Sequence, residues 1–377
     1  MDEISEQLQK MNIAIVGAGL TGCTLGYLLS KRKHNITIFE KERWIGGMCK
    51  TMYLKGLKYE HSGHIFHTNK KEIVDFIKQF CEIRSFKHYV GSKVRDEIYP
   101  FPICKRTIDL HPKKEKILGE LRKLPEEPRT DDFEVAIISM VGKTLYKDFV
   151  KNYTEKMWGM SPKELPAEMA FKRISPNDKD ESYFKDKYQF YPLPDYNFLL
   201  SQMVKGCTVF TNEEYKKVFD DYFDLIIFTN SIDEVIEKKE KLEYRSIEII
   251  PEIVNQKYFH KNYGTVNYPN DEDLLRITEY KKINGQESDN TLITKEYPSD
   301  KYKQYPVNTE KNEELFNKYL KEICKSKNKF VFGRLGLYKY FNMGECIEMC
   351  INNIDFIENY LKMKPQEKYE KYCELRR

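Results

Sequence analysis

Short apolar runs recur at four places along the chain and predict buried strands. They are Asn12 to Val16, Ile36 to Glu40, Asp224 to Thr229 and Lys329 to Phe332. Between the first two, Leu25, Leu28 and Leu29 recur at helical spacing, which predicts a helix. The order strand, helix, strand is that of a βαβ unit. We expect all four strands to share one sheet.

Other patterns predict the remaining elements. Residues 71–80, residues 133–149 and the chain from Met343 onward have helical spacing, and residues 112–130 suit a surface helix and loop. Residues 171–190 are polar and contain Pro176, so we expect an exposed loop there. Residues 243–310 alternate between apolar and polar side chains, which predicts antiparallel strands.

Glycines lie where the first predicted strand turns into the helix. Gly17, Gly19 and Gly22 form the pattern GxGxxG, in which the glycines allow a tight turn, approach of a pyrophosphate and close packing of the helix. The helix N-terminus favours phosphate charge. Glu40 ends the second strand, where a carboxylate can accept from a ribose hydroxyl. We therefore predict a dinucleotide site whose further contacts are Leu20 and Lys41.

A second glycine pair, Gly46-Gly47, follows within a few residues. It resembles the extended fingerprint of two-dinucleotide-binding flavoproteins, so FAD is favoured over NAD. The alternative is a simple turn.

Composition narrows the class of protein. The 63 basic and 59 acidic residues leave a net charge of +4, which indicates no general nucleic-acid surface. The nine cysteines form no CxxC pair, which favours reduced thiols over a disulfide framework or a metal site. The polar N-terminus does not resemble a signal peptide, and no apolar run reaches the roughly 18 residues of a membrane span. We expect a soluble, cytoplasmic protein.

Seven short segments follow the glycine fingerprint in a characteristic order. They are EHSGHIFHTN from Glu60, YTEKMWG from Tyr153, LEYRS from Leu242, RITEY from Arg276, KEYP from Lys295, YPVN from Tyr305 and GRLGLYKYFNM from Gly333. Together they resemble the prokaryotic-type UDP-galactopyranose mutases over nearly the whole chain. The resemblance implies interconversion of UDP-galactopyranose and UDP-galactofuranose, with N5 of reduced FAD as the nucleophile and UDP as the leaving group.

The resemblance also implies roles for individual residues. A diphosphate leaving group needs fixed positive charge, which arginine supplies with a bidentate fork. The matching arginines are Arg173, in the family's mobile loop, Arg245 and Arg276. The matching phosphate-contacting tyrosines are Tyr183, Tyr305 and Tyr340. Tyr153 would stack on uracil, and Trp158 would line the sugar pocket. For each residue the alternative is a surface charge or a core aromatic ring.

On the flavin side, the resemblance assigns His67 to the catalytic site and His64 to its surroundings. The alternatives are a metal-binding pair and two ordinary core histidines. Arg334 is placed near FAD, and Asn342-Met343 opens a helix whose N-terminus would stabilise the anionic reduced flavin.

The family organisation implies three domains. The chain length agrees with this, because a single hydrophobic core rarely exceeds roughly 250 residues. The fold class is mixed α/β, with a discontinuous Rossmann-like FAD-binding domain over residues 11–84, 200–242 and 326–365. A helical domain with the mobile loop covers residues 100–180. An antiparallel-sheet substrate domain covers residues 85–99, 181–199 and 243–325.

The sequence departs from the family at three places, the first of which is the segment ISPN after Arg173, where another arginine is common. Asn342 stands where aspartate is usual, and Leu193-Pro194-Asp195 stands where glycines are usual. These departures keep open a mutase for a related UDP-sugar and a binding protein without catalysis. A true FAD-dependent oxidoreductase is a further alternative, because the N-terminal fingerprint alone does not exclude it. We further expect NAD(P)H as the reductant and a homodimer.

Overall fold

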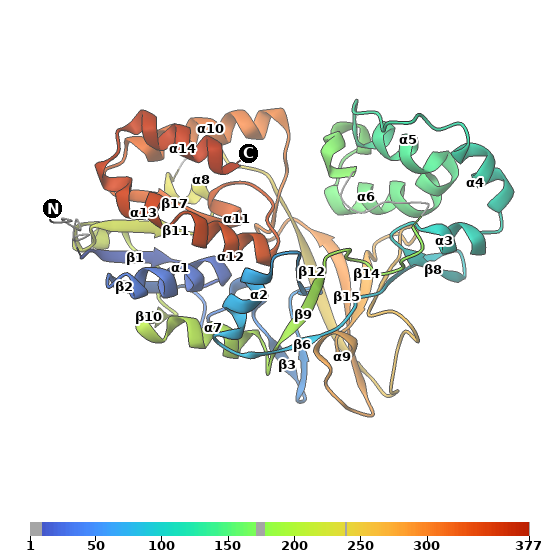
Figure 1. Ribbon diagram of the computed structural model, residues 1–377, viewed down its shortest axis with the longest axis horizontal. Coiled ribbons are helices and arrows are strands. Elements are labelled where there is room, and N and C mark those ends of the chain that lie inside the picture. The colour runs from blue at the N-terminus through green and yellow to red at the C-terminus, as the bar shows by residue number, and fades with distance from the viewer. Residues whose placement is uncertain (1–9, 171–177, 238–239, 377) are drawn as a thin grey trace, which may run out of the picture.

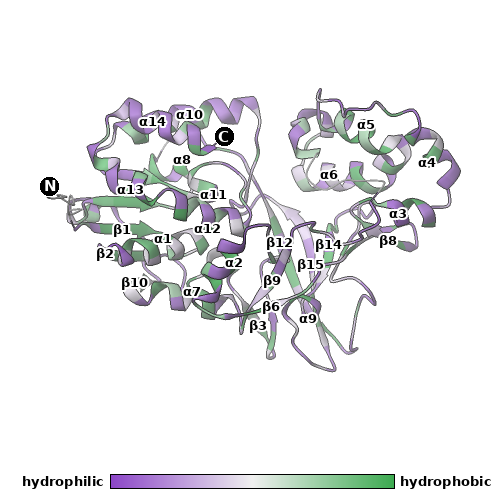
Figure 2. Cartoon of the chain, viewed as in Figure 1, coloured by the Kyte–Doolittle hydropathy of each residue, from purple (hydrophilic) through white to green (hydrophobic). Residues whose placement is uncertain are grey.

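A five-stranded parallel sheet forms one side of the computed structural model, which describes residues 10–170, 178–237 and 240–376 (Figure 1). Its order is β10-β2-β1-β11-β17. The strands are β1 (Asn12–Val16), β2 (Asn35–Glu40), β10 (Thr208–Thr211), β11 (Leu225–Phe228) and β17 (Lys329–Val331). The prediction that the four apolar runs share a sheet is confirmed. Figure 2 shows the inner strands β1 and β11 as mostly hydrophobic, because helices cover them.

Helices pack around this sheet. The helix α1 (Leu20–Lys31) contacts α7 (Tyr196–Met203) and α12 (Met343–Asn352). The helix α10 (Glu310–Lys325) contacts α8 (Ile232–Val235), α14 (Pro365–Arg376) and β17. Residues 310–325, which were expected in the antiparallel-sheet unit, therefore lie beside the parallel sheet. The reason is that Phe316, Leu320 and Ile323 on α10 bury their side chains in the core of that sheet.

A second, seven-stranded sheet has the order β16-β12-β15-β14-β13-β7-β8. Its strands are β7 (Val90–Val94), β8 (Glu97–Phe101), β12 (Tyr244–Val254), β13 (Thr265–Asn267), β14 (Arg276–Glu279), β15 (Thr291–Ser299) and β16 (Tyr305–Pro306). All neighbours are antiparallel except β13 and β7. The antiparallel strands predicted for residues 243–310 are therefore confirmed. The short helix α9 (Lys281–Asn284) follows β14.

A three-stranded sheet of order β5-β9-β6 lies between the two larger ones (Figure 1). It contains β5 (Phe66–Thr68), β6 (Glu82–Ser85) and β9 (Tyr188–Leu193), and α2 (Lys71–Lys78) connects β5 to β6. The loop predicted over residues 171–190 is wrong at its end, because β9 begins at Tyr188. Phe190 is buried and stacks on Phe66. A hairpin of β3 (Met52–Leu54) and β4 (Leu57–Tyr59) completes this part.

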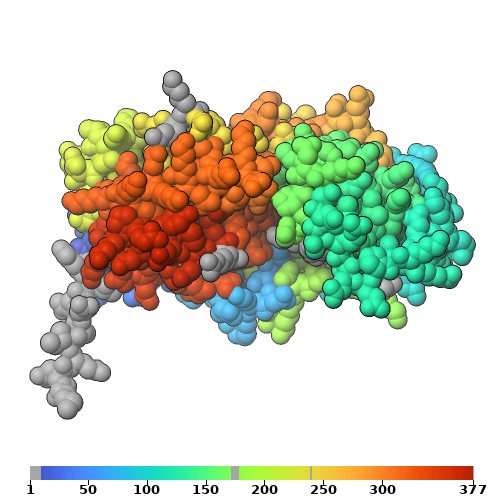
Figure 3. Space-filling model, turned by 90° about the horizontal axis from the view of Figure 1, so that it is seen from above, coloured from blue at the N-terminus to red at the C-terminus, as the bar shows by residue number. Residues whose placement is uncertain are grey.

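Helices form a separate lobe with its own core, coloured teal to green in Figures 1 and 3. They are α3 (Lys105–Leu110), α4 (Lys114–Leu121), α5 (Phe133–Leu145) and α6 (Lys151–Trp158). The helix predicted over residues 133–149 is interrupted at Gly142, where φ is +81°, and a further helical turn covers Tyr146–Val150. Within the ranges that the structure describes, no helix has the length and apolar character needed to cross a membrane.

Candidate functional site

Two glycines where β1 turns into α1 cannot be replaced by larger residues, because neighbouring protein atoms occupy the space of a side chain. Gly17 has a φ of +101°, and a Cβ there would lie 2.3 Å from Oγ1 of Thr229. A Cβ at Gly22 would lie 2.0 Å from the carbonyl oxygen of Gly17. At Gly19, however, a Cβ would approach only Cα of Gly47, at 4.0 Å. The space beside Gly19 therefore suits the backbone approach of a pyrophosphate.

The second glycine pair packs directly on this loop. The backbone N–H of Gly46 donates to the carbonyl of Ala18 at 2.8 Å, and Gly46 forms an isolated parallel bridge with Gly19. Oε2 of the buried Glu40 accepts from the backbone N–H of Ala18 at 2.8 Å. A carboxylate has further acceptor positions, so Glu40 can still receive a ribose hydroxyl. The two glycine segments and the acid form one cradle for a dinucleotide.

Arg276 on β14 is the centre of a second polar group. Its Nε donates to Oε2 of Glu296 at 2.6 Å, its Nη2 to Oγ of Ser62 at 2.7 Å and its Nη1 to the hydroxyl of Tyr153 at 3.3 Å. Glu296 is fully buried, and its other oxygen accepts from the hydroxyl of Thr278. Because Arg276 and Glu296 are direct partners in the ladder of β14 and β15, the sheet register sets the direction of the guanidinium.

In this group, Arg276 keeps its positive charge and Tyr305 keeps the proton of its hydroxyl. Burial alone would lower the pKa of Arg276, but Glu296, Tyr153 and Tyr305 outweigh it and raise the pKa well above the ordinary value. Burial raises the pKa of Tyr305 to about 12, although Arg276 opposes the shift. The arginine therefore stays cationic and the phenol stays protonated, so both can donate to an anionic phosphate.

Two tyrosines and a second arginine lie next to this group. The rings of Tyr305 and Tyr340 stack with their centroids 6.2 Å apart. The guanidinium of Arg334, on α11 (Gly333–Gly336), lies 4.7 Å from the ring centroid of Tyr340 and 6.0 Å from that of Tyr305. Nε of Arg334 donates to the carbonyl of Phe341 at 3.0 Å, which holds the side chain in place.

The two predicted histidines have different environments. Nδ1 of His67 lies 2.9 Å from Oδ2 of Asp186, and the His67 ring stacks on Phe184 with centroids 3.8 Å apart. Burial and the charge of Arg334 lower the pKa of His64 to about 3, so its ring is neutral at ordinary pH. In the ranges that the structure describes, no three side chains of His, Cys, Asp or Glu gather to bind a metal ion.

The N-terminus of α12 lies against the histidine segment. Asn342 caps the helix, since its Oδ1 accepts from the N–H of Glu345 at 2.8 Å and its own N–H donates to the Glu345 carboxylate at 2.7 Å. A Cβ on Gly344 would lie 3.3 Å from the carbonyl oxygen of His67. Met343 is buried at the same point. Asparagine therefore keeps the capping function, without the charge of aspartate.

Residues 148–340, slightly more than half of the chain, match the family model of UDP-galactopyranose mutase. The chain belongs to the UDP-galactopyranose mutase family. Residues 15–80 also match the model of an NAD(P)-binding Rossmann-like domain, which agrees with the cradle around Gly17 and Glu40.

Similar proteins extend this assignment over nearly the whole chain. A dTDP-fucopyranose mutase from Escherichia coli is 27% identical, covering 90% of this chain and 96% of its own length. A UDP-galactopyranose mutase from Mycoplasma genitalium is 28% identical, with coverage of 91% and 94%. The crystal structure of a reduced UDP-galactopyranose mutase has the same fold, with a TM-score of 0.77, 15% identity and coverage of 96% and 99%.

Arg245 has a structural contact that its sequence motif did not reveal. Its Nε donates to the carbonyl of Met157 at 3.0 Å and its Nη2 to that of Lys156 at 3.4 Å, both at the end of α6. It is also the cross-strand partner of Tyr305. The guanidinium therefore caps the helix, and its contact with substrate stays a prediction.

The other aromatic residues expected in the substrate pocket of this family member are placed as follows. The backbone N–H of Tyr183 donates to the carbonyl of His88 at 2.8 Å, and its ring makes an edge contact with Phe184. Tyr183 is also close enough to Tyr153 to influence the pKa of that phenol. Trp158 is half-buried and packs against the core of the helical lobe. That contact agrees with a core role for Trp158 and leaves its place beside the sugar a prediction.

Three further predicted residues remain. Arg173 lies outside the described residues. Leu20 is buried as the first residue of α1, and Lys41 is exposed after β2.

Sequence reasoning missed several partners of the predicted residues. Glu296 lies inside the motif KEYP and Asp186 lies three residues after Tyr183, but nothing in the sequence marked them as partners of Arg276 and His67. Ser62 has a φ of +72°, which a non-glycine residue rarely adopts and which no sequence pattern signals. A buried acid in a strand could have drawn attention to Glu296.

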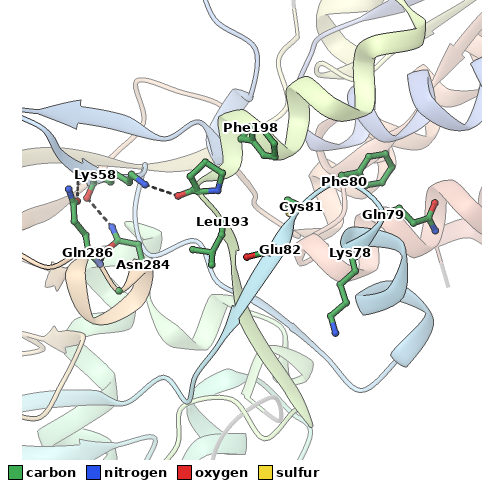
Figure 4. A pocket seen from close by; sticks show the side chains of 12 residues that line it. Lys58, Lys78, Gln79, Phe80, Cys81, Glu82, Leu193, Phe198, Asn284 and Gln286 are labelled. Carbon is green, nitrogen blue, oxygen red and sulfur yellow. Dashed lines mark hydrogen bonds between the residues drawn. The ribbon is translucent and has the colours of Figure 1, made fainter.

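An open pocket of about 850 Å³ lies away from these residues (Figure 4). Lys58, Phe80, Phe198, Asn284 and Gln286 are among its lining residues. The side chain of Lys58 is bonded to the carbonyl of Pro194 at 2.7 Å. None of the predicted site residues lines this pocket, so it is separate from the candidate site.

Proposed function

We propose that this protein is a flavin-dependent isomerase that interconverts UDP-galactopyranose and UDP-galactofuranose. The Arg276 group carries the proposal, because a charged guanidinium held by Glu296 and Ser62 beside two phenols is suited to a diphosphate. Departure of UDP from the sugar requires such a clamp. The amine or apolar substrate of a flavin oxidase does not.

FAD fits the residues at the first site. The cradle of Gly17, Gly19 and Gly46 would hold the pyrophosphate, and Glu40 would hold the adenosine ribose. Reduced FAD bound there would supply the nucleophile, N5, for displacement of UDP from the anomeric carbon. The capped N-terminus of α12 would place positive helix dipole near the flavin.

The chain's own residues supply binding and orientation. Arg276 would neutralise the charge that develops on the diphosphate as UDP leaves, and Tyr305 and Tyr340 would donate to it while their rings exclude water. Tyr153 on α6 would stack on the base. Holding UDP close throughout allows it to return to the sugar after ring opening and closure.

The proposal is tested by turnover of UDP-galactofuranose, followed by chromatography of the two sugar nucleotides. Protein reconstituted with FAD and reduced with dithionite should form UDP-galactopyranose, and the same protein in the oxidised state should not. Because one relative acts on dTDP-fucopyranose, the dTDP-fucose pair is measured in parallel. Turnover of the dTDP sugar alone would replace the proposed substrate, and failure with both would contradict the isomerase function.

Three further properties belong to the proposal. NAD(P)H is the reductant, which bleaching of the flavin absorbance by NADPH under anaerobic conditions would test. The protein is a homodimer, which light scattering would test. It acts in the cytoplasm, where UDP-sugars and NAD(P)H are available together.

A further inference from the structure

Lys156 on α6 binds a loop of the neighbouring sheet through three backbone carbonyls. Its Nζ donates to the carbonyl oxygens of Tyr268 at 2.7 Å, Asp271 at 2.6 Å and Leu274 at 2.8 Å. An ammonium group has three donors and no acceptor, so these bonds use its full capacity. Burial lowers the pKa of Lys156, while Asp271 and Asp273 oppose the shift. The three carbonyl oxygens therefore hold the charged ammonium group of Lys156 on the half-buried face of α6.

The loop that Lys156 holds leads directly to Arg276. Residues 268–275 connect β13 to β14, and Arg276 is the first residue of β14. A second contact holds the same loop, because Nδ2 of Asn152 on α6 donates to Oδ1 of Asn270 at 3.1 Å. Asn270 in turn donates to the carbonyl of Asp148 at 3.0 Å. Through this loop, the helical lobe is tied to the start of the strand that carries the arginine.

The helix α6 is held from the sheet side as well. Arg245 on β12 caps its C-terminal carbonyls, those of Lys156 and Met157. Gly159 then ends the helix with a φ of +67°, and a Cβ there would lie 3.1 Å from the guanidinium carbon of Arg245. The helix that carries Tyr153 is therefore fixed to the sheet at both the loop and the helix end.

We propose that Lys156 is a positioning residue that sets the separation of Tyr153 and Arg276 and thereby the affinity for a nucleoside diphosphate. Tyr153 lies one turn before Lys156 on α6, and its hydroxyl accepts from Arg276 at 3.3 Å. A base stacked on Tyr153 and a diphosphate bound to Arg276 belong to one ligand, so the distance between these residues must match that ligand. This assignment rests on the proposed function, since it takes the ligand to be a sugar nucleotide.

The chain offers a matched control. Nζ of Lys281 on α9 also donates to three backbone carbonyls, those of Lys257 at 2.7 Å, Ser288 at 2.5 Å and Asn290 at 3.1 Å. It holds loops of the same sheet and lies near Glu279, at the opposite end of β14 from Arg276. Lys156→Met and Lys281→Met therefore remove equivalent sets of bonds, and only the first lies between the two binding residues.

The experiment measures the Kd of UDP for both variants and the wild type by calorimetry, together with Tm. We expect Lys156→Met to raise the Kd of UDP about 10-fold or more, and Lys281→Met to change it less than about 2-fold, at similar losses of Tm. Equal effects on Kd, or an unchanged Kd in Lys156→Met, would overturn the assignment. If Lys156→Met does not fold, Asn270→Ala at its exposed position is used, and a Kd equal to the wild-type value overturns the assignment. Absence of UDP binding by the wild type would instead contradict the proposed function.

Discussion

Glu296 on β15 and Arg276 on β14 are direct cross-strand partners, and Nε of the arginine donates to the fully buried carboxylate at 2.6 Å. A buried carboxylate is stable only with a partner, so the pair fixes both side chains. Because Nε is used for Glu296, the two Nη groups point away from it toward Ser62 and Tyr153. The buried pair thus orients the donors that the proposed substrate requires.

The variant Arg276→Lys should show whether UDP binding needs only a positive charge or also the planar guanidinium. Lysine keeps the positive charge beside Glu296 but lacks the planar fork, so the fold should persist while UDP binds about 10- to 100-fold more weakly, or about 1.5–3 kcal/mol. The FAD content of the purified protein should not change. Calorimetric titration with UDP measures the loss.

The control for this variant is Arg32→Lys. Arg32 also faces a buried carboxylate, that of Glu358, with Nη1 3.5 Å from Oε2. It is the residue that follows α1, far along the chain from every predicted substrate residue. UDP affinity should stay at the wild-type value in Arg32→Lys, and an unchanged affinity in Arg276→Lys would contradict the role of the fork.

Ser62 has an unfavourable backbone conformation, and its side chain contacts Arg276. Its φ of +72° suits glycine, whereas its hydroxyl accepts from Nη2 of Arg276. Both Ser62→Gly and Ser62→Ala remove the hydroxyl, but only alanine keeps the unfavourable backbone. We therefore expect Ser62→Gly to be about 1 kcal/mol more stable than Ser62→Ala in urea unfolding. UDP should bind both variants more weakly than the wild type and to the same extent. Equal stability of the two would show that the conformation carries no cost.

His64 should make the protein less stable in mild acid. Its pKa is lowered from 6.5 to about 3 by burial and by Arg334. As the pH falls below 6.5, the unfolded chain takes up a proton that the folded protein excludes, so the free energy of unfolding falls. The loss is up to about 1.4 kcal/mol per pH unit for one group.

Urea unfolding near pH 7.5 and near pH 5 measures this effect, with His64→Gln as the comparison. The variant cannot take up the proton, so its stability should fall less between the two pH values. The pKa of His260 is also lowered, to about 4, by burial and by Lys282 and Lys93. His260 therefore also lowers the free energy of unfolding in acid, but it is present in both proteins and does not affect the comparison. Parallel profiles for the wild type and His64→Gln would refute the assignment.

Asp186 should act through His67. The carboxylate accepts from Nδ1 of the ring when that nitrogen carries the proton, and its other oxygen accepts from Asn69 at 3.0 Å. Asp186→Asn keeps the size but removes the charge that orients the imidazole, so kcat should fall about 10-fold or more with FAD still bound. Asp180→Asn serves as the control, because among the described residues the Asp180 carboxylate bonds within its own segment, to Ser182 and Lys185. Equal kcat values in the two variants would argue against a role for the dyad.

Much of the fold could be predicted because it depends on local patterns. The apolar runs around Ile15 and Ile227 identify buried strands wherever they occur, and GxGxxG between a strand and a helix has few structural uses. The predicted loop over residues 171–190 failed at β9 because Tyr188–Leu193 becomes a strand only by pairing with β5 and β6. Residues 310–325 were assigned to the antiparallel-sheet unit from the family organisation, whereas their buried face, with Phe316 and Leu320, packs in the core of the parallel sheet.

The sequence by itself determined the Rossmann-like unit and the family, since these follow from residue types at short spacing and from motifs in a fixed order. The roles of the arginines and tyrosines stay predictions. Only the tertiary structure showed that Ser62 and Glu296 hold Arg276, that Asp186 contacts His67 and that Lys156 and Arg245 fix α6. Arg276 and Ser62 are 214 positions apart, and their contact depends on how β14 packs against the segment between β4 and β5. A hydrogen bond requires atoms within about 3 Å, and only the packed chain brings such distant residues to that separation.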